Sequence, residues 1–231
     1  MRRNIITTSD GSKTIQLVDW NEQYHSVHGA LAEAQHVFLK NGLAHRIQIE
    51  DILEGDKRHL HIAEMGLGTG LNLLLTYDFL TREKLDLEVT YTGIDKFPIS
   101  CEEQSQLNYE KYADSLNSSS FSSMCKQTWN TKAMYSGGFS LEKKQTDLSV
   151  YINNEPIDLI YFDAFGPRVQ PELWTEESLN VLVSNMNTNA VFVTYCAKGV
   201  VRRSLQNLGL RVERLPGPPG KREMLRGVKE N

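Results

Sequence analysis

The stretch Glu64-Met65-Gly66-Leu67-Gly68-Thr69-Gly70-Leu71-Asn72 decides the fold of this 231-residue chain. The apolar run 60–63 before it is typical of a strand, and the run 73–80 after it is typical of a helix. A strand, a glycine-rich turn and a helix in this order present backbone N–H groups to a nucleotide-like ligand at one edge of an α/β sheet. The stretch therefore predicts a Rossmann-like α/β fold with a ligand site at this turn.

The glycine spacing and two acidic residues indicate which ligand binds at this turn. The spacing Gly66-x-Gly68-x-Gly70 differs from the G-x-G-x-x-G of dinucleotide enzymes. Glu64 beside the turn would repel a pyrophosphate and attract an ammonium group, and Asp95, at the end of the next predicted strand, can accept hydrogen bonds from ribose hydroxyls. S-adenosylmethionine has an ammonium, a sulfonium and a ribose but no phosphate. The pattern predicts this cofactor, with Glu64, Gly66, Gly68, Thr69, Gly70, Asn72 and Asp95 as its binding residues.

The rest of the chain fits one mostly parallel sheet with helices between the strands. We expect strands at 60–65, 87–94, 139–145, 157–162, 190–194, 210–215 and 222–228. We expect helices at 70–81, 98–115, 119–134, 172–186 and 198–208. The Pro/Gly loop 216–220 joins the last two strands as an antiparallel hairpin, which is the usual end of a seven-stranded class I methyltransferase sheet.

A small β/α extension is expected before this sheet. Asp10-Gly11 between two short apolar runs is a hairpin signal, and residues 28–39 have helical periodicity that Asn41-Gly42 should end. We therefore expect an N-terminal extension, 1–45, packed on a methyltransferase domain, 46–231. The length suits one globular unit.

Asp163 is the predicted catalytic residue. It follows the apolar run 157–162, which is typical of a buried parallel strand, and ligands of open α/β sheets bind at such strand ends. Methyl transfer to an amine needs a free lone pair on nitrogen, and a carboxylate here can hold the amine and accept its proton. The alternative for Asp163 is a helix cap or a loop hydrogen bond. Phe165 in the following loop could stack on adenine or on a substrate base.

Two further predictions have structural alternatives. Asp147, after the predicted third strand, could accept from the adenine amino group, although a turn aspartate is equally compatible. The net charge is −4, yet the segment from residue 198 onward has nine basic and three acidic residues, a net of 9 − 3 = +6. Such asymmetry is compatible with a polyanion footprint, with Arg202, Lys221 and Arg222 as phosphate contacts, or with a solvated charged face.

Several classes of protein are not expected. The chain has no apolar run long enough to span a membrane and no secretory leader pattern. Its three cysteines lie far apart, which suggests a reducing cytoplasm and no metal-type pair. The histidines lack a supporting acid cluster, so we expect no metal site.

The motifs together resemble a family, the bacterial MnmD methyltransferases, which are the free-standing relatives of the methyltransferase half of MnmC. The matching stretches run in the family's order from residue 24 to 228. They are Tyr24-His25-Ser26 with Gly29-Ala30 and Glu33; 36–39; 64–72; 91–95; 163–167 with 171–174; and 220–224. The resemblance implies methylation of the 5-aminomethyl group of the tRNA wobble uridine, often 2-thiolated. It also implies substrate contacts in the anticodon region from Phe165, Gly166, Pro167 and Trp174.

Two departures and three alternatives accompany this resemblance. The loop reads Phe165-Gly166-Pro167-Arg168, where MnmC-type chains tend to have Phe-Ala-Pro followed by Lys-Asn-Pro, and no flavin-binding motif follows, so another enzyme would supply the aminomethyl substrate. The alternatives are an aminopropyltransferase like spermidine synthase, a small-molecule amine N-methyltransferase, and a catalytically idle RNA-binding scaffold. The sequence makes no prediction of oligomeric state.

Overall fold

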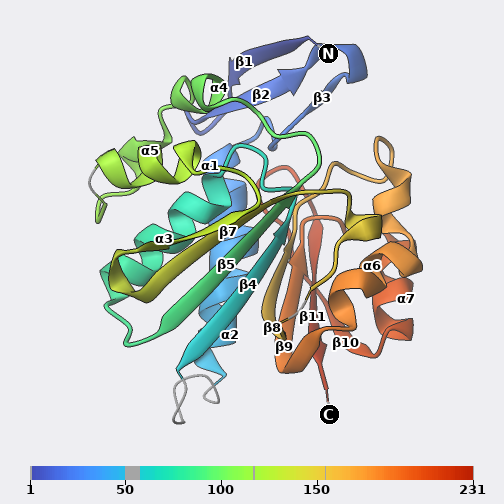
Figure 1. Cartoon of the computed structure of the whole chain (residues 1–231). Helices are drawn as coiled ribbons and strands as arrows, with labels where there is room; N and C mark the ends of the chain where they lie inside the picture. The colour runs from blue at the N-terminus through green and yellow to red at the C-terminus, as the bar shows by residue number, and fades with distance from the viewer. Residues whose placement is uncertain (1, 50–57, 117, 154, 231) are drawn as a thin grey trace.

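The computed structural model describes residues 2–49, 58–116, 118–153 and 155–230, and a single large sheet forms its centre (Figure 1). Within these residues the sheet has eight strands in the order β10-β11-β9-β8-β4-β5-β7-β6. Strands β9, β8, β4, β5 and β7 run parallel, whereas β11 is antiparallel to β9 and β10, and β6 is antiparallel to β7. Their bounds are β4 (His59–Met65), β5 (Glu88–Asp95), β6 (Thr131–Tyr135), β7 (Phe139–Gln145), β8 (Ile157–Phe162), β9 (Met186–Thr194), β10 (Leu210–Pro216) and β11 (Glu223–Lys229).

The predicted fold class is confirmed, and the sheet has one strand more than the seven predicted, β6. All seven expected strands are present and the last two form the expected antiparallel hairpin. The expected helix 119–134 is wrong in its second half, because α5 (Ser118–Lys126) ends early and β6 follows. Asn130 adopts a left-handed φ of 61°, which ends a helical path. Gln127 Nε2 then donates to the carbonyls of Thr131 and Leu141, which ties β6 to β7.

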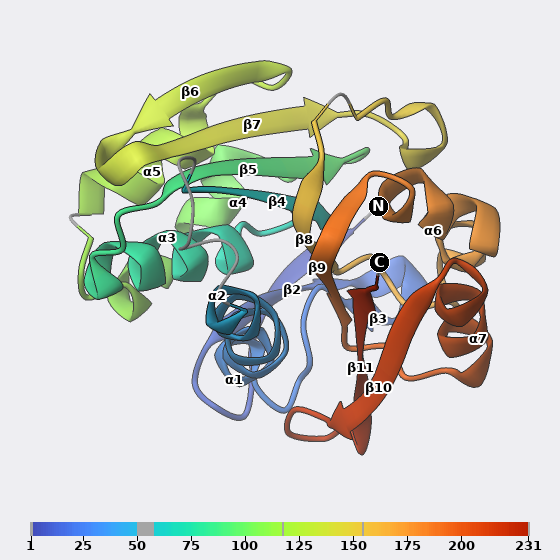
Figure 2. The same cartoon turned by 90° about the horizontal axis from the view of Figure 1, so that it is seen from below.

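Helices cover both faces of the sheet (Figure 2). One face carries α3 (Leu71–Glu83), α5 and a long N-terminal helix, and the other carries α6 (Glu176–Val183) and α7 (Gly199–Asn207). The buried apolar side chains of β8 alternate between the two cores, as expected of a parallel strand covered on both faces, and Asp158 is the one charged residue of the strand. The remaining short helices are α4 (Cys101–Ser105), η1 (Val18–Trp20), η4 (Tyr109–Tyr112), η5 (Ser136–Gly138), η6 (Leu148–Val150) and η7 (Pro171–Trp174).

Two expected helices are shorter than predicted. The expected helix 98–115 is split into α4 and η4, because Asn108 between them has a left-handed φ of 54°. The expected helix 172–186 becomes η7 followed by α6, and β9 already begins at Met186.

The N-terminal helix does not stop at Asn41-Gly42, which corrects the expected end. α1 (Ala30–Ala34), the π-helix η2 (Gln35–Ala44) and α2 (His45–Gln48) form one continuous rod. A Cβ on Gly42 would lie 3.0 Å from Val193 Cγ2 and 3.1 Å from Tyr161 Cε1. Gly42 therefore allows the helix to approach β8 and β9 closely, and is not a helix end.

A small antiparallel sheet lies over the carboxyl ends of the central strands, at the top of Figure 1. It consists of β1 (Arg3–Thr7), β2 (Lys13–Leu17) and β3 (Glu22–Gln23), and the expected turn at Asp10-Gly11 joins the first two. Because this sheet and the central strand ends line one cavity, the N-terminal segment is part of the site.

Candidate active site

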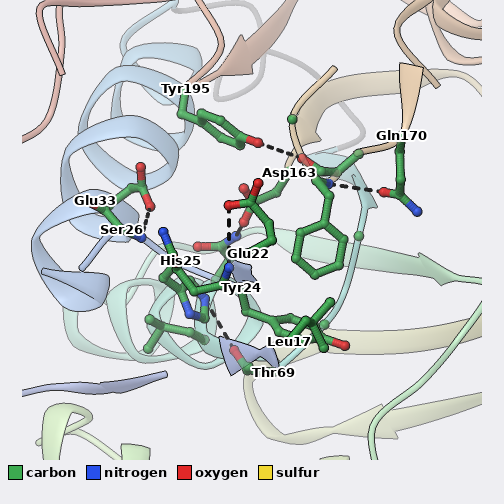
Figure 3. A pocket seen from close by; sticks show the side chains of 18 of the residues that line it. Leu17, Glu22, Tyr24, His25, Ser26, Glu33, Thr69, Asp163, Gln170 and Tyr195 are labelled. Atoms are coloured by element: carbon green, nitrogen blue, oxygen red, sulfur yellow. Dashed lines mark hydrogen bonds between the residues drawn. The ribbon is translucent and has the colours of Figure 1, made fainter. Parts of the chain in front are cut away.

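A cavity of about 630 Å³ lies between the small sheet and the carboxyl ends of β4, β5 and β8 (Figure 3). Of the predicted site residues, those lining it are Gly66, Gly68, Thr69, Asn72, Asp95, Asp163, Phe165, Gly166 and Lys221. Glu64, Gly70, Asp147, Pro167, Trp174, Arg202 and Arg222 are not among its lining residues. The fold thus brings the predicted glycine-rich turn and the predicted base to one cavity.

The glycine-rich turn is shaped for close backbone approach. Gly66, Gly68 and Gly70 have φ values of 90°, 50° and 75°, in the left-handed region that favours glycine. A Cβ on Gly66 would lie 2.6 Å from the Asp163 carbonyl oxygen, so the turn packs directly on the end of β8.

Asp95 braces this turn from the end of β5. Its carboxylate accepts the N–H of Gly68 at 2.9 Å and the N–H of Phe97 at 2.8 Å. Burial raises the pKa of Asp95, although these two bonds oppose the shift. A carboxylate fixed beside the cavity can accept further hydrogen bonds from a ligand's hydroxyl groups.

Glu64 does not line the cavity, but it is hydrogen-bonded to Asn72, which does. The Asn72 amide donates from Nδ2 to Glu64 Oε1 and to Asp163 Oδ2, both at 2.9 Å, and Tyr91 OH donates to Glu64 Oε2 at 2.7 Å. Burial raises the pKa of Glu64 to about 8. Asn72 lines the cavity, and its Oδ1 is buried with no hydrogen-bond partner among the described residues, so one acceptor of this side chain is unsatisfied.

Asp163 lies at the centre of the cavity in Figure 3. Its N–H donates to the Met65 carbonyl at 2.9 Å, which holds the residue against the end of β4. Burial raises the pKa of Asp163 well above its usual range, and the negative charges of Glu33 and Glu64 raise it further. The Asn72 hydrogen bond and the Lys221 charge oppose this shift. A carboxylate whose pKa is raised is a stronger base than an ordinary one.

Aromatic rings form another wall of the cavity. The Phe165 ring packs edge-on against Tyr24 at 4.9 Å and against Trp20 at 6.4 Å between ring centroids. Trp174 is buried outside the cavity, and its Nε1 donates to the Phe165 carbonyl at 2.8 Å. Trp174 therefore holds the loop that carries Phe165.

The predicted polar residues at the edge of the site have other partners. Asp147 accepts from Lys96 Nζ at 2.6 Å and caps η6 through the Ser149 N–H, which together lower its pKa to about 2. Lys221 forms an ion pair with Glu33 inside the cavity. Three arginines of the basic segment are paired on the terminal hairpin, as Arg211–Glu230, Arg214–Glu223 and Arg226–Glu213.

Tyr24, Glu33 and Tyr195 line the cavity but were not predicted as site residues. They come from two distant segments, the N-terminal segment and the end of β9, and no local motif other than the family's matching stretches marked Tyr24 and Glu33. His25 also lines the cavity, and burial lowers its pKa to about 4, so it stays neutral. In the part of the chain that the structure describes, no group of His, Cys, Asp and Glu could hold a metal ion, and no helix is long and apolar enough to cross a membrane.

Comparisons with known proteins point to one family. A family profile described as S-adenosyl-L-methionine-dependent methyltransferase matches residues 117–230. The tRNA 5-methylaminomethyl-2-thiouridine biosynthesis bifunctional protein MnmC of Nitrosospira multiformis is 31% identical over 221 residues, covering 90% of this chain and 34% of that protein. The chain thus spans about a third of the length of the curated relatives it matches.

Solved structures agree on the fold. MNMC2 from Aquifex aeolicus superposes with a TM-score of 0.75 and 23% identity, covering 100% of this chain and 71% of that one. Spermidine synthase from Thermotoga maritima superposes with a TM-score of 0.53 and 13% identity, covering 100% of this chain and 69% of that one. Both likenesses concern the fold alone.

Proposed function

We propose that this chain, which belongs to the S-adenosyl-L-methionine-dependent methyltransferase family, methylates the 5-aminomethyl group of the tRNA wobble uridine. The curated relatives are named for the biosynthesis of 5-methylaminomethyl-2-thiouridine on tRNA. An aminomethyl group becomes a methylaminomethyl group by one N-methylation, which is the reaction that this family's cofactor supports. A cytoplasmic location is part of the proposal, since tRNA is the substrate.

The observation that carries the proposal is the position of Asp163 beside the glycine-rich turn. Its carboxyl accepts from Asn72, and the residue lines the same cavity as Gly66 and Gly68. A carboxylate there can hold an amine, accept its proton and orient its lone pair toward a ligand on the turn.

The residues at the turn fit the cofactor. When bound, the cofactor supplies an electrophilic methyl group on a sulfonium. Asp95 would accept from the ribose hydroxyls, and the buried, unpaired Asn72 Oδ1 would accept from the ammonium group. Glu64 would align Asn72 for this contact. The left-handed glycines would let the ligand approach the backbone closely.

The substrate side of the cavity suits a nucleobase. Phe165 and the partly exposed Trp20 offer ring faces or edges at its mouth, and base–aromatic stacking is worth about 1–3 kcal/mol per base. Gly166 and Pro167 would shape the loop beside the base, with Trp174 as its support. Arg202 and Arg222 would contact phosphates of the anticodon region.

Mass spectrometry of tRNA nucleosides tests the proposal. The enzyme is incubated with cofactor carrying a labelled methyl group and with tRNA from a strain that supplies the 5-aminomethyl form. We expect label in 5-methylaminomethyl(-2-thio)uridine, and none with tRNA whose wobble uridine lacks the amine. Labelling of free polyamines or of another nucleoside instead would contradict the assigned substrate.

A further inference from the structure

A partly buried ion pair, between Glu33 and Lys221, lies in the same cavity as Asp163. Glu33, on α1, is 4% exposed, and its Oε2 accepts the Ser26 N–H at 2.8 Å (Figure 3). Its Oε1 accepts from Lys221 Nζ. The same ammonium lies 3.7 Å from the centroid of the Tyr195 ring. A carboxylate and an aromatic face are the two groups that hold a desolvated ammonium best.

The loop that carries Lys221 is seated firmly on the N-terminal helix. Gly220 has a φ of 83°, and a Cβ there would lie 2.0 Å from the His28 ring. The Lys221 N–H donates to the Pro218 carbonyl at 2.9 Å, and the Pro216 carbonyl bonds to His36 Nε2 at 2.8 Å. The hairpin loop therefore directs Lys221 into the cavity, away from any outer phosphate-binding surface.

The charge of Glu33 acts on Asp163. After burial, the charge of Glu33 is the largest cause of the raised pKa of Asp163, while Lys221 lowers it. The Tyr195 hydroxyl donates to the Ala164 carbonyl at 2.8 Å. Burial raises the pKa of Tyr195, and the charges of Asp163 and Glu33 raise it further. The other titratable groups around Asp163, Glu33 and Tyr195 are Asp10, Glu22, His25, Glu64 and Cys196.

We infer that Glu33 is a second carboxylate of the acceptor-amine site, facing the amine together with Asp163, and that Lys221 is a positioning residue that balances its charge. This inference rests on the proposed function and names how the amine is recognised. An aliphatic ammonium enters a site that already holds two carboxylates and one lysine ammonium. Two carboxylates alone would raise the pKa of the acceptor amine and keep it protonated and unreactive, and the positive charge of Lys221 opposes this effect.

The proton and electron balance of the step is simple. The acceptor ammonium first gives one proton to Asp163, which frees the nitrogen lone pair. The lone pair then forms the new N–C bond while the S–C bond breaks, and that electron pair stays on sulfur. Positive charge thus moves onto nitrogen in the transition state, where Glu33 can stabilise it because the carboxylate is already oriented.

Variants of the pair should move the pH dependence in opposite directions. Glu33→Gln removes a negative charge and leaves Lys221 uncompensated, so the acid limb of the single-turnover rate should move down by about one pH unit. Lys221→Met removes the positive charge, so the limb should move up by a similar amount. The double variant should return toward wild type, and Lys221→Arg should stay close to it.

Binding gives a readout that does not depend on turnover. Affinity is measured in the presence of the demethylated cofactor, for tRNA with the 5-aminomethyl group and for tRNA with plain wobble uridine. Wild type should prefer the amine-bearing tRNA; Glu33→Gln should reduce this preference about tenfold, a change of about 1.4 kcal/mol, and Lys221→Met should increase it. Lys111→Met is the matched control, because Lys111 lies over the Tyr112 ring at 4.7 Å, outside the cavity.

The outcomes separate the inference from the proposed function. The inference is overturned if the acid limbs of the two single variants move in the same direction. It is also overturned if Glu33→Gln keeps the wild-type preference for amine-bearing tRNA and has a normal melting temperature. A higher KM for Lys221→Met, with a lower salt slope and an unmoved pH limb, would assign Lys221 to phosphate instead. Failure of wild type to methylate aminomethyl tRNA would sink the proposed function itself.

Discussion

At the residue scale, one amide connects the two halves of the site. Asn72 Nδ2 bridges Glu64 and Asp163, while its Oδ1 is buried without a hydrogen-bond partner among the described residues. The cofactor side and the acceptor side therefore share a single orienting group. The charge of Glu64 raises the pKa of Asp163, so the protonation state of Asp163 depends on that of Glu64.

Asp163→Asn should reduce turnover far more than cofactor affinity. The substitution keeps the shape and the acceptor for Asn72, and removes the group that takes the amine's proton. We expect a loss of kcat on the order of 10²–10⁴-fold, the range for a positioned acid–base group. Raising the pH should partly restore the rate by supplying neutral amine. Near-normal turnover at neutral pH, measured by methyl incorporation, would move the base elsewhere.

Asp95→Ala should weaken cofactor binding. The variant loses the acceptor for the ribose and also the brace on the Gly68 N–H, so we expect a loss of roughly 1–3 kcal/mol in titration calorimetry. Asp147→Ala is the comparison, since this acid lies outside the cavity and pairs with Lys96. A larger loss for Asp147 than for Asp95 would reverse the assignment of the two acids.

Glu64→Gln should make stability less dependent on pH. The pKa of Glu64 is 4.5 in an ordinary setting and about 8 in the folded chain, so between these values only the unfolded state releases the proton. The free energy of unfolding then falls as the pH rises through this window, by at most about 1.4 kcal/mol per pH unit for this group. In urea unfolding, the free energy of unfolding of the variant should therefore rise relative to that of wild type between pH 5 and pH 8. The exposed Glu83→Gln should show no such trend.

At the scale of elements, packing decides where helices end. Asn41-Gly42 has the composition of a helix stop, yet the rod continues to Gln48 because it lies against β8 and β9. The sequence pattern reports local preference, and here tertiary packing overrides it. In contrast, the turn at 66–70 combines local preference with position, and its strand, turn and helix were predicted within a few residues.

Gly42→Val should destabilise the fold. Its side chain would meet Val193 and Tyr161, which are fully buried, and Tyr161 is also fixed by a 3.2 Å hydrogen bond between its hydroxyl and Thr76. Overpacking of this kind costs about 1–3 kcal/mol. Lys40→Val, exposed on the same helix, isolates the propensity cost of a β-branched residue. Equal changes in the denaturation midpoint for both variants would show that the contact at Gly42 is loose.

At the scale of the whole molecule, contacts between distant segments explain what the sequence could not predict. Periodicity located the central strands, and strand ends located Asp95 and Asp163. Glu33, Tyr195 and Lys221 meet only because α1, the end of β9 and the terminal hairpin converge on one cavity. Summed charge does not show which basic residues lack an acidic partner, since several arginines of the basic segment are paired with acids across the hairpin.

The pairing pattern predicts which basic residues hold tRNA. Within the described residues, Arg202 and Arg222 make no ion pair, whereas Arg211 is paired with Glu213 and Glu230. If Arg202 and Arg222 contact phosphates, each substitution to Gln should lower the slope of log affinity against log salt by about 1. Arg211→Gln should change the slope less, because that guanidinium is already neutralised by its neighbours. A slope that stays at the wild-type value in the Arg202/Arg222 double variant would move the phosphate footprint to another face, with Lys198 and Arg203 of the α7 segment the next positions to substitute.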